Sequence, residues 1–453
     1  MNTNNKALAL KKFVSYKRIT IQKNLFNPKQ SFSSKLRYES AAFIRSAWNE
    51  ILAVPGFSEN VSLYFHFPFC KDNRCTYCMY YSQISADGTV PETYFKYLED
   101  ELEYFSPSIT NILIQSLYIG GGTPSLLSRS QIEQLFAKIE HIEFIPKAEK
   151  SFEQSFNTTS NEKLSLLRKM GINRLSFGVQ SMERAVLKNV NRKFSDLTLI
   201  RDLLSHGKSL GFKEINIDLM IGLPGETKGG VTQAIKNLIE CGVDSITIYI
   251  FRHLKHHLDT IDMDKIETYN SDYIPQMIKI IRAQIVSSGW VDTVNDDRTE
   301  YQFFTSQDHW DTYDLVGYRT QADPESKNSV MGFGLTAYSY VQDFFRYENR
   351  EKMMVFNPEN KSYAFDMIKS EDRQRIYVLD KLMRDGVVNH KQFHKQFGKK
   401  FVNVFDHELA DLRTLKKMKL DAHYFRLIGK DRIENAALSK FFWDQQYLES
   451  LDY

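Results

Sequence analysis

The sequence predicts an α/β protein built around a parallel β-sheet, and two observations support this prediction. Between residue 61 and about residue 260, short runs rich in β-branched and aromatic residues alternate with amphipathic stretches of helical period. The chain of 453 residues is also long enough for two or three domains. Repeated strand–helix–strand units place parallel strands side by side with helices outside them. The sheet is then either an open doubly wound sheet or a full or partial barrel.

The composition excludes several other classes of protein. With 59 Lys and Arg against 56 Asp and Glu, the net charge of +3 creates no large field of one sign, so we expect no nucleic-acid partner. The 32 Phe and 24 Tyr, against only 11 Pro, supply apolar side chains for packed cores and indicate a globular protein. The N-terminal segment lacks a secretory signal, and no run of about 18 apolar residues occurs, so we expect a cytoplasmic protein.

The elements follow in order along the chain. Residues 1–60 mix basic and polar side chains with a helical pattern at 34–54 and are expected to form an N-terminal extension. From about residue 270 the signals weaken into helices and a glycine-containing segment, and the tail from about 363 indicates three helices and a short hairpin. The β-rich runs between these parts are VSLYFHFPF (61–69), SLYIGGG (116–122), SFEQSF (151–156), RLSFGVQ (174–180), EINIDLMIGLPG (214–225) and DSITIYIF (244–251).

Chemically informative residues lie at the ends of these runs. Cys70 follows the first run, a GGGTP segment at 120–124 follows the second, Glu153 lies in the third, and Gln180 ends the fourth. A GLPGE segment at 222–226 closes the fifth. In a parallel sheet or barrel the carboxyl ends of the strands meet at one edge, where ligands bind. We therefore expect the functional site at this edge.

Three of the four cysteines in the chain, Cys70, Cys75 and Cys78, lie within nine residues. Cytosolic thiols stay reduced, so this cluster favours a metal or redox site over a disulfide framework. Structural zinc requires four ligands, and only His66 is near enough to complete the set, from an awkward position in a strand. An iron–sulfur cluster with one iron not bound by protein explains three cysteines better. Cys241 is expected to be a small buried residue.

Several motifs resemble, in order and spacing, the radical S-adenosylmethionine (SAM) family of oxygen-independent coproporphyrinogen III oxidase. The resemblance implies a partial (β/α)6 TIM-type barrel and a 4Fe–4S cluster on the three clustered cysteines. It also implies S-adenosylmethionine on the fourth iron, a second S-adenosylmethionine beside it, an electron donor such as flavodoxin or ferredoxin, and reductive cleavage to a 5′-deoxyadenosyl radical. The motifs are LYFHFPFC (63–70), CTYC (75–78), YIGGGTPSLL (118–127), GINRLSFGVQSM (171–182), VNR (190–192) and NIDLMIGLPGET (216–227).

The resemblance also implies which positions bind the cofactors. Glycines let backbone approach a bound methionine moiety, and a polar side chain on an apolar strand, as at Gln180 and Asp218, is costly to bury without a partner. Arg192 can clamp a carboxylate or be a surface charge. The expected cofactor-binding residues are Tyr64, Tyr77, Gly121, Gly122, Thr123, Glu153, Gln180, Arg192, Asp218, Arg252 and Tyr338, with Cys70, Cys75 and Cys78 as cluster ligands.

The resemblance divides the chain into four parts. Residues 1–60 are the N-terminal extension and residues 61–290 are the radical SAM core. Residues 291–362 are expected to close the barrel around substrate and cofactor, and residues 363–453 to form a winged-helix-like α+β domain.

Two departures from the family pattern bear on function. Four residues separate Cys70 from Cys75 where the family has three, and Met79 stands where the oxidase often has a further cysteine. The oxidase-like opening RYTSYPT is also replaced by FVSYKRITIQK. These differences favour a class C methyltransferase, which transfers a methyl-derived carbon from a second S-adenosylmethionine to an sp² carbon of an aromatic small molecule, for example a menaquinone-type quinone. The oxidase and a haem-binding chaperone are the alternatives.

Two further segments bear on the substrate site. His253, His256 and His257 indicate a polar loop at the barrel mouth more than a metal or haem site. Four aromatic residues, Phe303, Phe304, Trp310 and Phe333, either line a substrate pocket or belong to the core. A quinone substrate would bring the protein transiently to a membrane surface through its basic N-terminal segment.

Overall fold

The computed structural model describes residues 37–55, 61–71, 74–78, 80–251, 273–292, 301–306, 328–341, 344–350, 354–384, 386–429, 435 and 438–442. Several predicted features lie outside these residues. They are the basic N-terminal segment, Met79, Arg252, His253, His256, His257, Trp310 and the side chains of Phe303 and Phe304.

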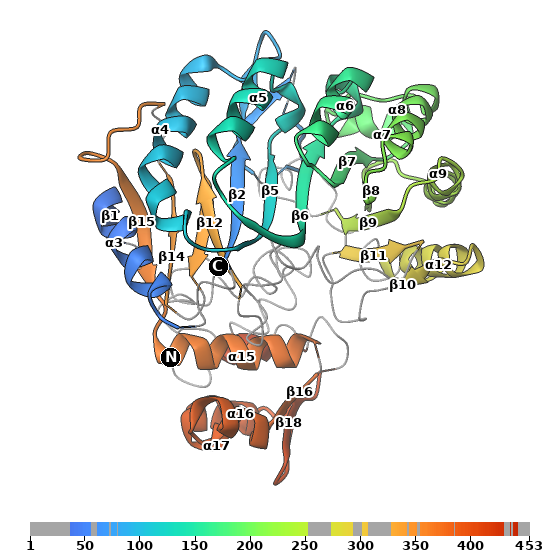
Figure 1. Cartoon of the computed structure of the whole chain (residues 1–453). Coiled ribbons are helices and arrows are strands. Elements are labelled where there is room, and N and C mark those ends of the chain that lie inside the picture. The colour runs from blue at the N-terminus through green and yellow to red at the C-terminus, as the bar shows by residue number, and fades with distance from the viewer. Residues whose placement is uncertain are drawn as a thin grey trace.

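Thirteen strands of the described chain form one open sheet (Figure 1). Six neighbouring strands, from β2 to β9, run parallel and follow one another in sequence order. The prediction of a parallel α/β sheet is therefore confirmed. In spatial order the strands are β1 (Arg37–Ser40), β15 (Ser362–Met367), β14 (Phe345–Glu348), β13 (Tyr338–Val341), β12 (Ser329–Phe333), β2 (Val61–Phe67), β5 (Ile114–Gly121), β6 (Phe144–Gln154), β7 (Arg174–Gln180), β8 (Glu214–Ile221), β9 (Ser245–Ile250), β11 (Tyr301–Thr305) and β10 (Val291–Asp292).

The helices that connect the parallel strands form a single layer outside the sheet. Each helix contacts the next in the order α3, α4, α5, α6, α8, and α9 contacts α12. A doubly wound sheet would have helices on both faces, so this layer selects the partial barrel. The helices are α3 (Ala41–Leu52), α4 (Glu92–Ile109), α5 (Arg129–Lys138), α6 (Asn161–Lys169), α7 (Arg184–Asn189), α8 (Leu197–Ser209), α9 (Lys228–Glu240) and α12 (Ile274–Ser287), with short 3₁₀ turns η2 (Pro124–Leu126) and η3 (Phe156–Thr158).

Local sequence explains where these helices begin. Ser128 and Gln131 form a reciprocal capping box at the start of α5. Asp196 accepts a hydrogen bond from the amide of Leu199 at the start of α8, and Thr227 caps α9 in the same way. Each cap directly precedes an amphipathic run, as the sequence pattern requires.

Every second residue of the parallel strands packs under the helices. On β2 these are Val61, Leu63, Phe65 and Phe67, all buried in the main core. Since side chains alternate along a strand, the intervening residues lie on the other face of the sheet, which is the inner face of the partial barrel. Phe333 is also buried and stacks on Phe65, so it belongs to the core rather than to a substrate pocket.

Part of the predicted N-terminal extension belongs to the large sheet. Strand β1 pairs antiparallel with β15, with Arg37 opposite Phe365. Helix α3 follows and buries Trp48, whose indole Nε1 donates a 2.9 Å hydrogen bond to the hydroxyl of Tyr347 on β14. Residues 37–52 therefore help to close one edge of the sheet.

The segment predicted to close the barrel adds strands on both sides of the parallel core. On one side β12 pairs parallel with β2, and β13, β14 and β15 continue the sheet antiparallel. On the other side β11 pairs antiparallel with β9. Strand β15 ends at Met367, so the large sheet continues a few residues past the predicted boundary at 362/363.

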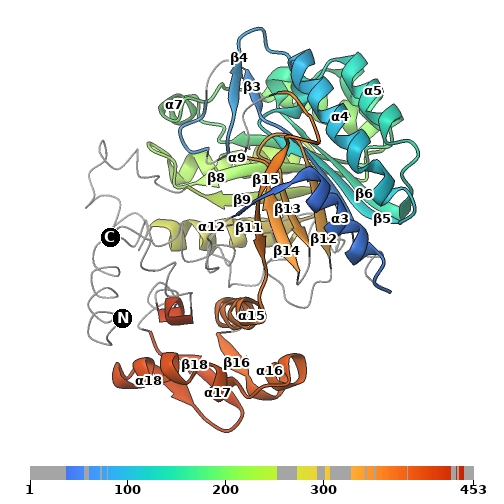
Figure 2. The ribbon, with the colours of Figure 1, turned by 90° about the vertical axis from the view of Figure 1, so that its left-hand side faces the viewer.

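A smaller unit follows the large sheet and has the predicted winged-helix-like order. Figures 1 and 2 both show this unit below the large sheet, with its first helix between the sheet and the rest of the unit. Its elements are α15 (Ser370–Arg384), β16 (Val387–Asn389), α16 (His390–Phe397), α17 (Phe401–Val404), α18 (Asp406–Thr414), β17 (Met418–Leu420), β18 (Tyr424–Leu427) and the 3₁₀ turn η5 (Lys440–Phe442). The β17–β18 hairpin pairs with β16 around a separate aromatic core.

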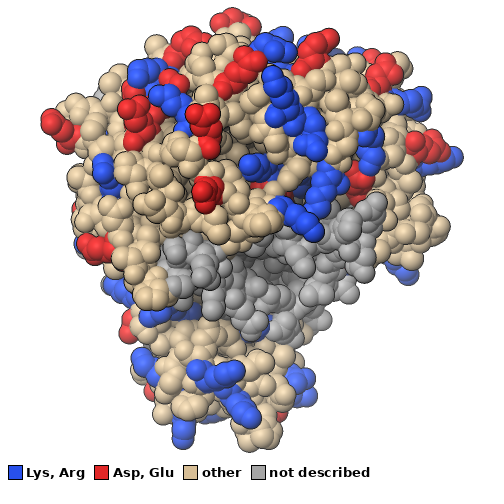
Figure 3. All heavy atoms as spheres, in the orientation of Figure 1, with Lys and Arg blue, Asp and Glu red and all other residues tan. Residues whose placement is uncertain are grey.

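None of the helices in the described part of the chain is long and apolar enough to cross a membrane. On the face shown in Figure 3, acidic and basic side chains are interspersed over the outer helical layer. This mixture agrees with the small net charge of +3.

Candidate functional site

The cysteine loop lies at the carboxyl end of β2. Cys70 lies in the short strand β3 (Phe69–Lys71), which pairs with β4 (Gln83–Ser85). Cys75 and Cys78 flank a turn, in which the amide of Cys78 donates a 3.1 Å hydrogen bond to the carbonyl of Cys75. All three are free thiols of intermediate exposure. Burial raises the pKa of the Cys70 thiol, and hydrogen bonds from Thr123 and Ser82 oppose that rise.

The segment 190–192 holds this loop from the side. The amide of Thr76 donates to the carbonyl of Val190 at 3.1 Å, and the Asn191 side-chain amide donates to the carbonyl of Arg74 at 3.0 Å. The two segments are more than 100 residues apart in the chain. Residues 190–192 of the VNR motif therefore hold the cysteine loop in place by hydrogen bonds, and we call this segment the brace.

Arg192 is turned inward from this brace. Its Nη1 lies 2.8 Å from the hydroxyl of Tyr77 and 3.7 Å from the sulfur of Cys75, and its Nη2 donates to the carbonyl of Gly178. Burial raises the pKa of Tyr77, so its hydroxyl stays neutral beside the guanidinium. The interpretation of Arg192 as a surface charge is therefore wrong, because the guanidinium lies between Tyr77, Cys75 and β7.

Gly121 and Gly122, at the carboxyl end of β5, form a glycine cradle against the backbone of Phe67 and Phe69. Gly121 has a φ of 120°, which favours glycine, and a Cβ there would lie 3.0 Å from the backbone of Phe67. A Cβ on Gly122 would lie 2.5 Å from the carbonyl oxygen of Phe69. The amide of Gly122 donates to the carbonyl of Phe67 at 2.8 Å. Only glycine allows the two backbones to approach so closely.

Glu153, on the neighbouring strand β6, contacts this cradle. Its carboxylate accepts a 3.0 Å hydrogen bond from the amide of Gly121 and a 2.8 Å hydrogen bond from the hydroxyl of Tyr118. Burial raises the pKa of Glu153 to about 7, with a further contribution from the nearby Asp218 carboxylate. The carboxyl group of Glu153 therefore changes its protonation state near neutral pH.

Asp218 projects from β8 on the same inner face. Asn216 donates from its amide to Asp218 Oδ1 at 2.8 Å and to the Ser176 hydroxyl at 2.9 Å, while its own oxygen accepts from Thr247 at 3.0 Å. Burial raises the pKa of Asp218 to about 6, and the guanidinium of Arg174 opposes the rise. Asn216 thus fixes the direction in which Asp218 presents its carboxylate.

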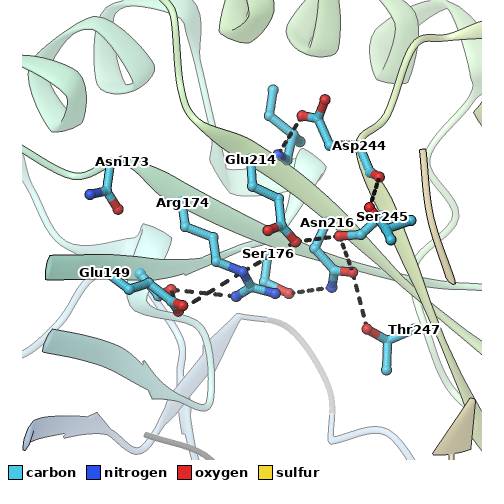
Figure 4. A network of polar contacts seen from close by, with 12 residues as sticks. Glu149, Asn173, Arg174, Ser176, Glu214, Asn216, Asp244, Ser245 and Thr247 are labelled. Carbon is cyan, nitrogen blue, oxygen red and sulfur yellow. Dashed lines mark hydrogen bonds and ion pairs between the residues drawn. The ribbon is translucent and has the colours of Figure 1, made fainter. Parts of the chain in front are cut away.

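A buried charge network lies nearer the amino ends of the same strands (Figure 4). Arg174 is 1% exposed, and its Nε lies 3.3 Å from a carboxylate oxygen of Glu214 and 3.9 Å from one of Glu149. Ser245 contacts both Glu214 and Asn216 and so connects this network to Asp218. Polar side chains therefore extend along the inner face from Glu149, Arg174 and Glu214 to Asp218.

Gln180 ends β7 in a strained conformation. Its φ is 69°, which is uncommon for a residue with a side chain. Its Oε1 is buried and accepts no hydrogen bond from the described residues. Such an oxygen at a strand end is suited to receive a donor from a ligand.

The remaining predicted residues lie around this centre. The hydroxyl of Tyr64 is 2.6 Å from Nδ1 of His66 on β2, and burial lowers the pKa of His66 to about 4, so its ring is neutral. Tyr338 lies on β13, two strands from β2, and its hydroxyl forms a hydrogen bond with the side chain of Arg346. Arg252 lies outside the described residues.

Several residues of this site were not predicted to bind a cofactor, although they lie within the motifs quoted from the sequence. These residues are Arg174, Ser176 and Asn216. Each is a polar residue that alternates with apolar residues along its strand, so its side chain lies on the inner face of the sheet. The sequence spacing Glu214, Asn216, Asp218 contains this signal. Within the described residues, no group of three or more His, Cys, Asp and Glu side chains is arranged to hold a single metal ion.

The chain is similar to known proteins in three respects. Residues 64–238 match the family model of the radical SAM superfamily, so the chain contains a radical SAM domain. Oxygen-independent coproporphyrinogen III oxidase of Salmonella typhimurium is 27% identical over 401 residues, covering 84% of this chain and 82% of that protein. The heme chaperone HemW of Lactococcus lactis is 32% identical over 189 residues, covering 42% of this chain and 48% of that protein.

A solved structure supports the fold. Coproporphyrinogen III oxidase from Escherichia coli superposes with a TM-score of 0.71 at 22% identity, covering 91% of this chain and 96% of that chain. The predicted radical SAM type of α/β fold is therefore confirmed.

The radical SAM domain uses a 4Fe–4S cluster and S-adenosylmethionine as cofactors, and the residues present fit both. Thiolates are the soft ligands that iron–sulfur clusters take, so Cys70, Cys75 and Cys78 would hold the cluster. The glycine cradle beside them gives a ligand access to backbone, and the free oxygen of Gln180 and the carboxylates of Glu153 and Asp218 lie on the same side of the sheet.

Proposed function

We propose that this chain, which contains a radical SAM domain over residues 64–238, acts on a porphyrin-type tetrapyrrole. The single observation that carries the assignment of the site is the position of the cysteine turn. Cys70, Cys75 and Cys78 lie beside the glycine cradle of β5, with the Arg192 guanidinium 3.7 Å from Cys75. In the proposal these cysteines hold the 4Fe–4S cluster.

The chain's own residues have separable tasks in this proposal. When bound, the cluster and S-adenosylmethionine supply a one-electron cleavage that yields a 5′-deoxyadenosyl radical. Gly121 and Gly122 leave room for the methionine moiety, and Gln180 Oε1 accepts a hydrogen bond from the ligand. Glu153 and Asp218 present carboxylates toward its hydroxyl or ammonium groups. Arg192 shields and orients the cysteine turn.

The substrate class comes from the relatives. Coproporphyrinogen III and heme are the molecules named for the two kinds of relative, and both are tetrapyrroles. The oxidases align with 82–86% of this chain, which includes parts beyond the radical SAM domain. We therefore prefer a tetrapyrrole to the quinone expected from the sequence, and hydrogen abstraction from a propionate side chain is the first reaction to test.

Class C methyl transfer is a second candidate, and one observation favours it. The chain has four residues between Cys70 and Cys75 and Met79 where the oxidase often has a cysteine, while Glu153, Gln180 and Asp218 are retained. Changed surroundings with retained cofactor residues suit a different use of the same radical, with a second S-adenosylmethionine as the carbon donor.

The test is turnover of the full chain after anaerobic reconstitution with iron and sulfide. S-adenosylmethionine, a chemical reductant and either coproporphyrinogen III or haem are added, and the products are analysed by mass spectrometry. Loss of carbon dioxide with formation of 5′-deoxyadenosine supports the oxidase reaction. S-adenosylhomocysteine and a product heavier by one carbon support methyl transfer. If no tetrapyrrole stimulates 5′-deoxyadenosine formation, the substrate class is wrong.

Two cysteine variants provide the matched control. Cys75→Ala removes a proposed cluster ligand, and Cys241→Ala removes the cysteine that ends α9. We expect iron binding and turnover to be lost in the first and kept in the second. Equal behaviour of the two variants would contradict the cluster assignment.

A further inference from the structure

The segment between Cys70 and Cys75 is one residue longer than in the family pattern, and its last residue is Arg74. An added residue lengthens the loop that must present two thiols, so the loop needs additional restraint to keep one geometry. The structure shows where that restraint is found.

The side chain of Arg74 reaches across the cysteine turn. Its Nη2 lies 3.0 Å from the carbonyl oxygen of Tyr80 and 3.4 Å from that of Cys78. The guanidinium therefore connects the residue before Cys75 to the residues after Cys78. Together with the 3.1 Å hydrogen bond from the Cys78 amide to the Cys75 carbonyl, this contact closes the turn on itself.

The main chain of Arg74 is held from outside the turn. Its carbonyl accepts a 3.0 Å hydrogen bond from the side-chain amide of Asn191, and the next-but-one residue, Thr76, donates to Val190 at 3.1 Å. Arg74 is thus tied through its backbone to the brace at 190–192 and through its side chain to the end of the turn.

The charge of Arg74 acts on the same residues. The guanidinium is exposed, and its Nη2 lies 3.4 Å from the carbonyl oxygen of Cys78, a proposed cluster ligand. A cation beside a cluster ligand favours the more negative, reduced state of the cluster.

We propose that Arg74 is a positioning residue that holds Cys75 and Cys78 in cluster-binding geometry and raises the reduction potential of the bound cluster. This inference rests on the proposed function, because it takes the three cysteines as cluster ligands. It goes further in assigning a task to the residue that lengthens the loop.

The test uses the full chain reconstituted anaerobically, with the rate of iron loss to a chelator as the first measurement. Arg74→Ala is expected to lose iron about 10-fold faster than the unaltered chain, the lower end of the effect of outer-shell partners on metal affinity. Arg74→Lys keeps the charge and a donor and is expected to restore most of the retention. Lys71→Ala is the matched control. Lys71 is an exposed cation that follows Cys70 in the sequence, but its aliphatic chain is directed toward Gly88.

The second measurement is the midpoint potential of the cluster, followed by electron paramagnetic resonance. The potential should fall in Arg74→Ala and recover in Arg74→Lys. Iron loss and potential unchanged in Arg74→Ala, or changed equally in Lys71→Ala, would overturn the inference. The melting temperature of the apo chain shows whether either variant is misfolded. If Arg74→Ala is misfolded, Arg74→Lys still tests the proposal. Failure of the unaltered chain to hold iron would instead contradict the proposed function.

Discussion

Gly122 provides a direct test of how closely the glycine cradle approaches the cysteine strand. A Cβ on Gly122 would lie 2.5 Å from the carbonyl oxygen and 2.8 Å from the amide nitrogen of Phe69. Phe69 begins β3 and precedes Cys70. Both contacts are with backbone, which cannot rotate away as the end of a flexible side chain can. Replacement of Gly122 by alanine must therefore push β3 away from β5.

The size of the effect follows from this geometry. The distance to the Phe69 oxygen must grow from 2.5 Å to at least the 3.4 Å of ordinary contact. Overpacking of this kind costs about 1–3 kcal/mol. If the fold absorbs the strain, the free energy of unfolding falls by that amount. If the cradle opens instead, the affinity for S-adenosylmethionine falls by about 5- to 150-fold.

The assay combines urea unfolding of the apo chain with calorimetric titration of S-adenosylmethionine into the reconstituted chain. Gly229→Ala is the control, because a Cβ on Gly229 in α9 meets nothing within 4 Å. That change should stabilise the chain, by at most about 1 kcal/mol, since alanine is the better helix former. A Gly122→Ala variant with unchanged unfolding and unchanged affinity would refute the close approach of the two backbones.

Three further predictions concern buried polar groups and packing. Glu101→Ala removes the acceptor of two tyrosine hydroxyls and of the Gly334 amide, and should lower the free energy of unfolding by about 3–5 kcal/mol in urea titration. Trp48→Ala should cost about 3–5 kcal/mol in the same assay, because the side chain is fully buried between α3 and the sheet. Asn216→Leu leaves Asp218 without its 2.8 Å donor and should weaken binding of S-adenosylmethionine about 10-fold by calorimetry, an effect that Ser176→Ala should show only in part.

The sequence predicted the parallel core because its signals are local. Alternating apolar residues mark the strands from β2 to β9, and polar residues near their carboxyl ends mark the site. Cys70, Glu153 and Asp218 were found in this way. The row Glu214, Asn216, Asp218 contains the same alternation, but only Asp218 was predicted to bind a cofactor.

The rest depended on contacts between distant parts of the chain. Residue 37 pairs with residue 365, and no local pattern indicates that this strand completes the large sheet. The role of Arg192 was equally hidden, because its partners Cys75 and Tyr77 are more than 100 residues away. Local pattern fixes which residues form strands and helices, whereas pairing over such separations is decided by tertiary packing.

The inner face carries more acid than base in its described part, and this predicts how a cationic ligand binds. Glu149, Glu153, Glu214 and Asp218 lie there with Arg174, and Arg192 lies beside them. Burial raises the pKa of Glu153 to about 7 and that of Asp218 to about 6, so both carboxyls are partly protonated near neutral pH in the unliganded chain.

A positive ligand lowers both pKa values, because it favours the ionised form of a neighbouring carboxyl. Binding of S-adenosylmethionine, which carries a sulfonium cation, should therefore release protons, and its affinity should rise as pH increases through about 6 to 7. Calorimetry at about pH 6.5 in two buffers of different ionisation enthalpy measures this release. S-adenosylhomocysteine has the same frame without the sulfonium charge, so it should release fewer protons, and Glu153→Gln should reduce the difference between the two ligands. Equal proton release by both ligands would mean that the carboxylates of β6 and β8 do not face the sulfonium.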